Sequence, residues 1–304
     1  MHQPCWRPHP QGRDAMPTSF EHASIAASRR YRLHSERIGE TFQIDVALPA
    51  AAPEGALPVV YVMDSNTVFG IAAQAMRFLQ SGDRARPALL VGVGYCLDGV
   101  ERPRNAYGAL RTRDLTPSLD QGFLDLMAEA QNGQPFQATP RATGGADDFL
   151  NFLVDELRPF VAERYDIDHA DQALVGSSLG GLFSLYAMLT RPGAFASYVA
   201  NSAALWWDAR MLFKLEEAFA QRRTDLCADL FLSAGGLEVQ APWSMVENFE
   251  RFTNQLRQRA YPNLKLTTHL FENESHTSVI PAALSRGLRA VLGGDARATH
   301  RRLT

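Results

Sequence analysis

The sequence predicts an α/β protein built on one mostly parallel sheet with helices on both faces. Continuous apolar runs at 57–63 and 87–95 are typical of strands that are covered on both faces. From residue 57 onward, predicted strands alternate with predicted helices, which is the order of parallel strands joined by helical crossovers. A further apolar run at 173–175 leads through a glycine-rich turn directly into an apolar helix, so one strand-to-helix connection is unusually tight.

The residues before this series predict an antiparallel edge. Residues 30–33 and 41–48 alternate polar and apolar side chains, and the short segment between them predicts a hairpin. Residues 1–27 contain several prolines and charged side chains and lack the apolar segment of a signal peptide, so we expect a poorly ordered tail. Met16 is an alternative start of the protein.

Periodicity predicts the remaining elements. We expect a turn at 64–66, helices at 71–80, 145–165, 211–221, 245–259 and 279–292, and strands at 198–200, 230–233 and 264–271. A long polar loop at 98–116 and a lid-like insertion at 118–144, with one short amphipathic helix, interrupt this order. Because no repeat or linker divides the chain, we expect a single domain over 28–304.

Composition narrows the classes of function. The formal net charge of −3 does not favour a nucleic-acid or membrane surface, and no apolar run approaches the length of a membrane span. The three cysteines (Cys5, Cys96 and Cys227) are widely spaced and odd in number, so we expect no disulfide framework and a reducing compartment. Because no targeting segment is recognised, we expect a cytoplasmic location. Because the chain lacks metal-ligand motifs and a glycine-rich phosphate loop, we expect no metal and no cofactor.

The tight connection contains the pattern G-x-S-x-G, formed by Gly176, Ser178 and Gly180. In α/β-hydrolases this pattern is the nucleophile elbow, in which a strained turn exposes the serine hydroxyl and small residues let strand and helix pass closely. The motif alone is common, but here an apolar strand precedes it and an apolar helix follows it. Ser178 is therefore the candidate nucleophile.

A serine hydroxyl needs a neighbouring base, and in this fold the partners follow in the order serine, acid, histidine. Three histidines follow Ser178. His269 lies within a predicted strand and His300 lies near the C-terminus, whereas His276 lies in the loop between the last strand and the last helix. That loop position favours His276 as the base over a solvated loop histidine.

The acid is less sharply defined. Glu238 follows the strand that ends at Ser233, where it could hold the imidazole tautomer and stabilise the imidazolium. Asp208 and Glu274 are alternatives, although Glu274 is only two residues from His276, and a serine–histidine pair without an acid also fits. Two backbone N–H groups should stabilise the oxyanion.

One of these oxyanion donors is expected at Leu179, directly after the nucleophile. The other is expected in the turn that follows the strand at 57–63, at Ser65 or beside it.

With these motifs in place, the chain resembles the "Putative esterase" family of α/β-hydrolases, which includes enterobactin and salmochelin trilactone esterases and related bacterial carboxylesterases. The matching segments are 60–66, 111–117, 144–149, 176–181, 205–208 and 274–276. The resemblance implies an α/β-hydrolase fold with Ser178 as nucleophile and His276 as base.

The resemblance also implies substrate-binding residues. Arg111 matches an arginine that can meet anionic or catecholate oxygens, and Trp206 and Trp207 match an aromatic wall beside the nucleophile. The alternatives are an ion pair of Arg111 with Asp114 and packing of the tryptophans in the core. The family usually has glycine where this chain has Ser65, and its siderophore branch often has an extra N-terminal domain or periplasmic anchor, of which this chain shows no sign.

We therefore expect a serine carboxylic-ester hydrolase that acts on a small-molecule ester, such as a siderophore trilactone or a small aryl ester. The same residues could instead transfer an acyl group to an alcohol, or the chain could be an inactive binding protein of this fold. An S-formylglutathione hydrolase is disfavoured because Ser177 stands where that branch usually has histidine. The sequence leaves the oligomeric state open.

Overall fold

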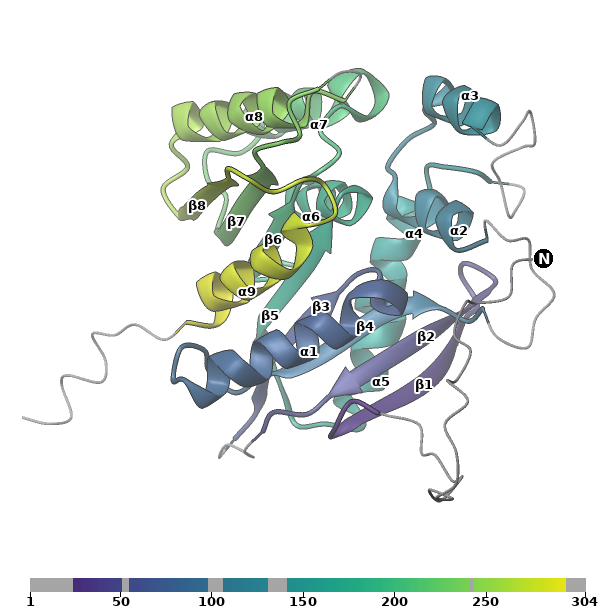
Figure 1. Cartoon of the computed structure of the whole chain (residues 1–304), viewed down its shortest axis with the longest axis vertical. Coiled ribbons are helices and arrows are strands. Elements are labelled where there is room, and N and C mark those ends of the chain that lie inside the picture. Colours follow the sequence, from purple (N-terminus) through teal and green to yellow (C-terminus); the bar gives the residue numbers. More distant parts are fainter. Residues whose placement is uncertain (1–23, 51–54, 98–105, 131–140, 241–242, 294–304) are drawn as a thin grey trace, which may run out of the picture.

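In the computed structural model, one eight-stranded sheet runs through the described residues, which are 24–50, 55–97, 106–130, 141–240 and 243–293. The strands are β1 (Ser28–Ser35), β2 (Glu40–Ala47), β3 (Leu57–Val62), β4 (Leu89–Tyr95), β5 (Ile167–Ser177), β6 (Ser197–Asn201), β7 (Ala228–Gly235) and β8 (Leu264–Phe271). Their order in the sheet is β1-β2-β4-β3-β5-β6-β7-β8 (Figure 1). The β1–β2 and β2–β4 pairs are antiparallel and the other neighbours are parallel, which confirms the predicted antiparallel edge.

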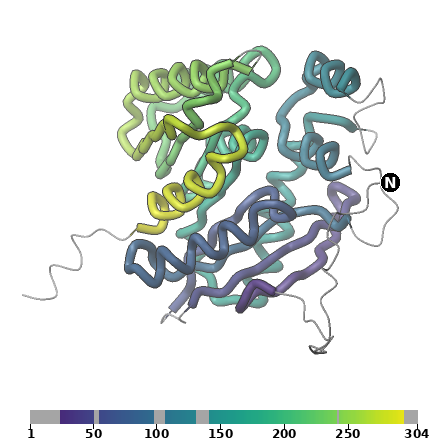
Figure 2. Tube along the Cα trace, in the orientation of Figure 1, coloured from purple at the N-terminus to yellow at the C-terminus, as the bar shows by residue number. Residues whose placement is uncertain are grey.

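Helices cover both faces of this sheet. They are α1 (Ser65–Ser81), α2 (Ala106–Leu115), α3 (Gln121–Ala130), α4 (Ala146–Asn151), the π-helical turn η1 (Phe152–Leu157), α5 (Arg158–Ala162), α6 (Leu179–Thr190), α7 (Trp207–Ala220), α8 (Met245–Arg259) and α9 (Val279–Leu292). Helices α1 and α9 lie side by side over one face, where they bury a smaller core (Figures 1 and 2). The larger core lies on the other face, beneath α4, α6, α7 and α8. The carboxyl ends of the parallel strands therefore lie between two layers of helices.

Two local predictions were wrong because polar side chains are buried. The predicted loop over 98–116 contains helix α2, while its residues 98–105 lie outside the described part. The turn predicted at 64–66 shortens to Asp64, and α1 begins at Ser65 rather than at Ile71. The Ser65 hydroxyl is buried and donates to Asp45, so its polarity marks an internal hydrogen bond rather than a solvated loop.

The ends of the chain and the insertion are described in part. The sheet begins at Ser28, and residues 1–23 of the expected tail lie outside the described part. Helix α3 confirms the short helix expected within 118–144, of which 131–140 are not described. Cys96 and Cys227 are free, and Cys5 is not described. Among the described helices, none has the length and apolar character needed to cross a membrane.

Candidate active site

Ser178 lies between β5 and α6 in a conformation that few residues other than glycine adopt. Its φ is 60° and its ψ is −118°, a combination that costs about 1–3 kcal/mol. Backbone hydrogen bonds hold it there: its N–H donates to the Asn201 carbonyl at 2.9 Å, and its own carbonyl accepts from Leu182 and Ala204. The surrounding backbone therefore maintains the strained turn that the G-x-S-x-G pattern predicted.

The glycines beside Ser178 allow the strand and the helix to pass closely. A Cβ atom at Gly176 would overlap the backbone of Gly180, and one at Gly181 would lie 3.0 Å from Ala203 Cα. A side chain at Gly176 would force the strand and α6 apart, and one at Gly181 would require the backbone of Asn201 and Ala203 to shift by a few tenths of an ångström. This close approach is the physical reason for the small residues around the serine.

His276 and Glu238 form a hydrogen-bonded pair near this turn. His276 lies between β8 and α9, and its Nδ1 lies 2.6 Å from Glu238 Oε2. The other carboxylate oxygen of Glu238 accepts from the Ser202 hydroxyl at 2.6 Å and from the Gly235 N–H at 2.8 Å. The side chain of Glu238 is 4% exposed and that of His276 is 45% exposed. A buried acid thus orients an imidazole that solvent and substrate can reach.

The environment of Glu238 favours its charged form. Burial by itself would raise the pKa of this carboxyl, but hydrogen bonds from His276, Ser202 and the Gly235 amide outweigh burial and lower it. The carboxylate is therefore ionised at neutral pH. A fixed negative charge at Nδ1 is the arrangement that can stabilise a charged imidazole ring.

The two alternative acids have other partners. Glu274 accepts a hydrogen bond from Ser278, and Asp208 lies at the start of α7, where its backbone N–H donates to Asp120. Within the described residues, Glu238 is the carboxylate that bonds to His276. No hydrogen bond in the described part joins the Ser178 hydroxyl to His276, although both line one pocket.

That pocket has a volume of about 380 Å³. It is lined by Ser178, Trp206, Leu237, Glu238, Gln240, Trp243, Met245 and His276. The rings of Trp206 and Trp243 lie 4.0 Å apart and form an aromatic wall. Sequence reasoning missed Trp243 and Met245, and the available signal was a loop with large apolar side chains close after Glu238.

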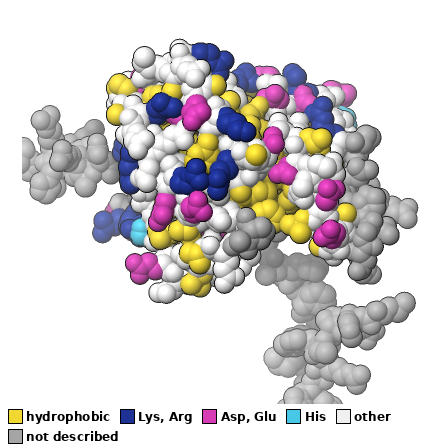
Figure 3. All heavy atoms as spheres, turned by 90° about the horizontal axis from the view of Figure 1, so that it is seen from above, with side chains coloured by type: hydrophobic (Ala, Val, Ile, Leu, Met, Phe, Trp, Pro, Cys, Tyr) yellow, Lys and Arg dark blue, Asp and Glu magenta, His cyan; other side chains and the backbone are white. Residues whose placement is uncertain are grey.

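Two exposed apolar side chains stand on either side of Glu238 in the chain. Leu237 and Val239 flank Glu238 and are 58% and 61% exposed. Seen from above in Figure 3, hydrophobic side chains gather near the middle of the face, with basic and acidic side chains around them. Exposed apolar area of this kind is typical of a binding surface for an apolar ligand.

The structure separates the two tryptophans that the sequence predicted as one wall. Trp206 lines the pocket, whereas Trp207 is fully buried and packs against Phe123 of α3 at 5.0 Å. Trp207 therefore belongs to the core, which was the alternative interpretation of that residue. It supports Trp206 from behind, with the two ring centres 5.7 Å apart.

The two predicted oxyanion donors occupy equivalent positions. Leu179 is the first residue of α6 and Ser65 is the first residue of α1. The first N–H groups of a helix have no partner within the helix, so they are available to an anion. The Ser65 side chain points away from the pocket, since a Cβ atom at Gly92 on β4 would overlap its hydroxyl.

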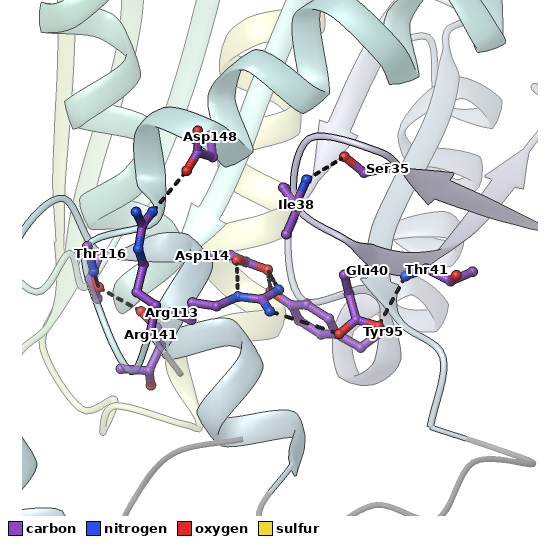
Figure 4. A network of polar contacts seen from close by, with 12 residues as sticks. Ser35, Ile38, Glu40, Thr41, Tyr95, Arg113, Asp114, Thr116, Arg141 and Asp148 are labelled. Atoms are coloured by element: carbon purple, nitrogen blue, oxygen red, sulfur yellow. Dashed lines mark hydrogen bonds and ion pairs between the residues drawn. The ribbon is translucent and has the colours of Figure 1, made fainter. Parts of the chain in front are cut away.

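Arg111 lies outside the pocket lining and is bound to Asp64. Its Nε and Nη2 donate to the two oxygens of Asp64 at 2.7 and 2.8 Å, and the Tyr107 hydroxyl donates to the same carboxylate. Asp114, the partner of Arg111 in the alternative interpretation, instead accepts from Arg113 (Figure 4). Arg111 and Asp114 are three residues apart on α2, a spacing at which helix side chains can meet, so the tertiary contact with Asp64, and not the helix period, decides the pairing.

Within the described residues, no cluster of three or more His, Cys, Asp and Glu side chains is placed to hold a metal ion.

Comparison with known proteins identifies the family to which the sequence and the fold are similar. The "Putative esterase" family model matches residues 92–272. The chain is 30% identical to the ferri-bacillibactin esterase BesA of Bacillus subtilis (86% of this chain, 89% of the relative). It is 32% identical to the siderophore enterobactin esterase of Emericella nidulans (81% and 88%). The crystal structure of the BES protein of Bacillus cereus superposes with a TM-score of 0.76 at 28% identity (91% and 99%).

Proposed function

Because the chain belongs to the "Putative esterase" family and is an esterase, we propose that it hydrolyses siderophore esters through an acyl-enzyme formed on Ser178. One observation carries the mechanism. The hydrogen-bonded pair of His276 and buried Glu238 lines the same pocket as Ser178, which stands on a strained elbow. This combination provides a nucleophile, a base and an orienting charge.

In this mechanism the Ser178 hydroxyl attacks the ester carbonyl while Nε2 of His276 accepts its proton. The charge of Glu238 stabilises the imidazolium through Nδ1. The N–H groups of Leu179 and Ser65 stabilise the tetrahedral oxyanion, a contribution of about 10²- to 10³-fold in kcat for each donor. His276 then protonates the leaving alkoxide, and a water molecule activated by His276 hydrolyses the acyl-enzyme.

The arrangement of helices supports this oxyanion site. Helix α1 covers one face of the sheet and α6 covers the other. Helix α1 begins at the carboxyl end of β3 and α6 begins at the carboxyl end of β5, and these two strands are neighbours in the sheet. The N-termini of α1 and α6 therefore place partial positive charge at the carboxyl ends of these two strands. A developing negative charge between Ser178 and the β3–α1 turn would lie close to both.

The pocket wall supports an aromatic substrate. Trp206 and Trp243 offer a broad indole surface on which a flat ring can stack, and Leu237 and Met245 complete an apolar lining. Two relatives are named for ferri-bacillibactin and for enterobactin. We propose the same class of siderophore ester for this chain, with small aryl esters as simpler substrates.

The decisive experiment replaces Ser178 with alanine. Turnover of short p-nitrophenyl esters should fall by about 10⁴-fold or more, because the residue carries the covalent step. Circular dichroism should show an unchanged fold, and a fluorophosphonate probe should label wild type but not Ser178→Ala. Undiminished turnover in the folded variant would refute the mechanism.

A substrate panel tests the proposed class. Enterobactin and bacillibactin, each with and without ferric iron, are compared with short aryl esters and a feruloyl ester. A kcat/KM for the siderophores well above that for the aryl esters supports the proposal. The opposite ranking would restrict the enzyme to small aryl esters.

A further inference from the structure

Asp64 occupies a strained turn at the end of β3. Its φ of 60° and ψ of 39° are left-handed, although it is not glycine. Its carbonyl accepts the N–H groups of Thr67 and Val68 at 2.9 and 3.1 Å, so its conformation determines where α1 begins. The direction of the next amide, that of Ser65, follows from the same dihedral angles.

This turn lies against the nucleophile elbow. Strands β3 and β5 pair in parallel, and the Met63 N–H donates to the Val175 carbonyl at 2.9 Å. A Cβ atom on Gly180, two residues after the nucleophile, would lie 3.5 Å from Asp64 Oδ2. The Asp64 carboxylate therefore lies beside the first turn of α6, and a shift of Asp64 would move one wall of the proposed oxyanion site.

Arg111 holds that carboxylate from helix α2. The two parallel hydrogen bonds at 2.7 and 2.8 Å use one edge of its guanidinium group, and its side chain is 18% exposed. Burial would lower the pKa of Arg111, but the charge and hydrogen bonds of Asp64 outweigh burial and raise it. A substrate anion would have to compete with a bidentate, largely desolvated carboxylate for this arginine.

From this geometry we propose that Arg111 is a positioning residue, which fixes the Asp64 turn and thereby aims the Ser65 amide at the oxyanion. It does not contact the substrate. The inference rests on the proposed serine mechanism and assigns a function to the ion pair of Arg111 and Asp64. A displacement of a catalytic donor by about 1 Å can cost about 10²-fold in rate, so such a support has a measurable effect.

The test compares Arg111→Gln with Arg113→Gln. Arg113 lies on the same helix and makes an equally close bidentate pair with Asp114, but it lies in a different pocket. For a neutral p-nitrophenyl ester, Arg111→Gln should lower kcat by about 10²-fold and leave KM within about twofold. Arg113→Gln should lose thermal stability to a similar degree while kcat stays within about threefold.

The affinity of an inhibitor is a measurement that a loss of stability alone would not change. A trifluoromethyl ketone forms a hemiketal oxyanion on the serine, so its Ki should rise in Arg111→Gln by the same factor as kcat/KM falls. Arg111→Lys retains the charge but loses the planar fork, and it should restore less than a tenth of the lost kcat. If Arg111→Gln does not fold, Arg111→Lys and Asp64→Asn take its place with the same expected loss in kcat.

Three results would overturn the proposal. The first is a KM raised selectively for anionic esters with kcat unchanged, which would make Arg111 a substrate-binding residue. The second is full activity in Arg111→Lys, and the third is an equal loss of kcat in Arg113→Gln. Activity in Ser178→Ala would instead refute the serine mechanism itself, so the two failures are distinguishable.

Discussion

Two buried ion-pair networks on helix α2 are chemically alike and are placed differently. The elbow network consists of Asp64, Tyr107 and Arg111, and the hairpin network consists of Glu40, Tyr95, Arg113 and Asp114. Each contains an arginine that forks onto an aspartate and a tyrosine hydroxyl that donates to the same carboxylate.

The difference lies in the backbone that each carboxylate controls. Asp64 stands on a left-handed turn beside the nucleophile elbow, 47 positions from its arginine. Asp114 is the immediate neighbour of Arg113 on α2, and the hairpin network reaches Glu40 on β2 and Tyr95 on β4 (Figure 4). The comparison teaches that the same charge pair can serve stability in one place and geometry of a site in another.

The largest expected effect comes from comparing the acid that binds His276 with the acid of the hairpin network. Glu238→Gln should lower kcat/KM by about 10³- to 10⁴-fold, because the amide cannot hold the productive imidazole tautomer or stabilise the imidazolium. Asp114→Asn should leave kcat/KM within about threefold while the protein loses about 3 kcal/mol of unfolding free energy, since it removes the carboxylate charge onto which the buried Arg113 guanidinium forks.

Steady-state kinetics and chemical unfolding measure both quantities. Glu274→Gln is the matched control for Glu238→Gln, because Glu274 is near His276 in sequence but bonds to Ser278. Comparable losses in Glu274→Gln and Glu238→Gln would contradict the assignment of the acid. A large kinetic loss in Asp114→Asn would erase the distinction between the two networks.

A smaller effect is expected where helix α3, which lies in the insertion predicted to be lid-like, meets the pocket wall. Asp120 accepts the N–H of Phe123 at the start of α3 and the N–H of Asp208 at the start of α7, both at 2.9 Å. Loss of such a capping carboxylate typically costs about 1 kcal/mol of stability. Because this carboxylate joins the starts of α3 and α7, Asp120→Ala should lower kcat/KM for bulky aryl esters by at most about fivefold, the rate equivalent of about 1 kcal/mol, and leave acetate esters unchanged.

Asp125→Ala is the control for this change, because Asp125 lies on the same helix and its side chain bonds to the exposed Gln121. Tryptophan fluorescence should respond to Asp120→Ala, since Trp206 lies 6.0 Å from Phe123. Equal losses for acetate and bulky esters would show that Asp120 acts on the chemistry and not on the fit of the substrate.

The smallest expected effect is a change in folding stability at low pH. The folded-state pKa of Glu238 lies below its ordinary value, so its contribution to stability is fully present above the unfolded pKa of about 4.3 and is lost as pH falls through the folded-state value. The difference in unfolding free energy between wild type and Glu238→Gln should therefore shrink between pH 6 and pH 3. Urea unfolding at several pH values measures it, and a difference that does not vary with pH would contradict the lowered pKa.

Local sequence patterns determined most of the fold. The predicted bounds 245–259, 264–271 and 279–292 agree with α8, β8 and α9, because hydrophobic periodicity reports directly which face of an element is buried. The same local reasoning pointed to Ser178, to His276 and to the loop that carries Glu238, since turn chemistry and chain order limit where such residues can lie. Their chemical roles stay predictions that the Ser178 and Glu238 variants test.

Tertiary structure alone decided how the polar and aromatic residues pair. It assigned Arg111 to Asp64 and Arg113 to Asp114, brought Trp243 against Trp206, and buried Trp207 in the core. The physical reason is that a charge or an indole ring takes its partner from whatever the fold brings within a few ångströms. Neither the period of a helix nor the composition of a loop contains that information.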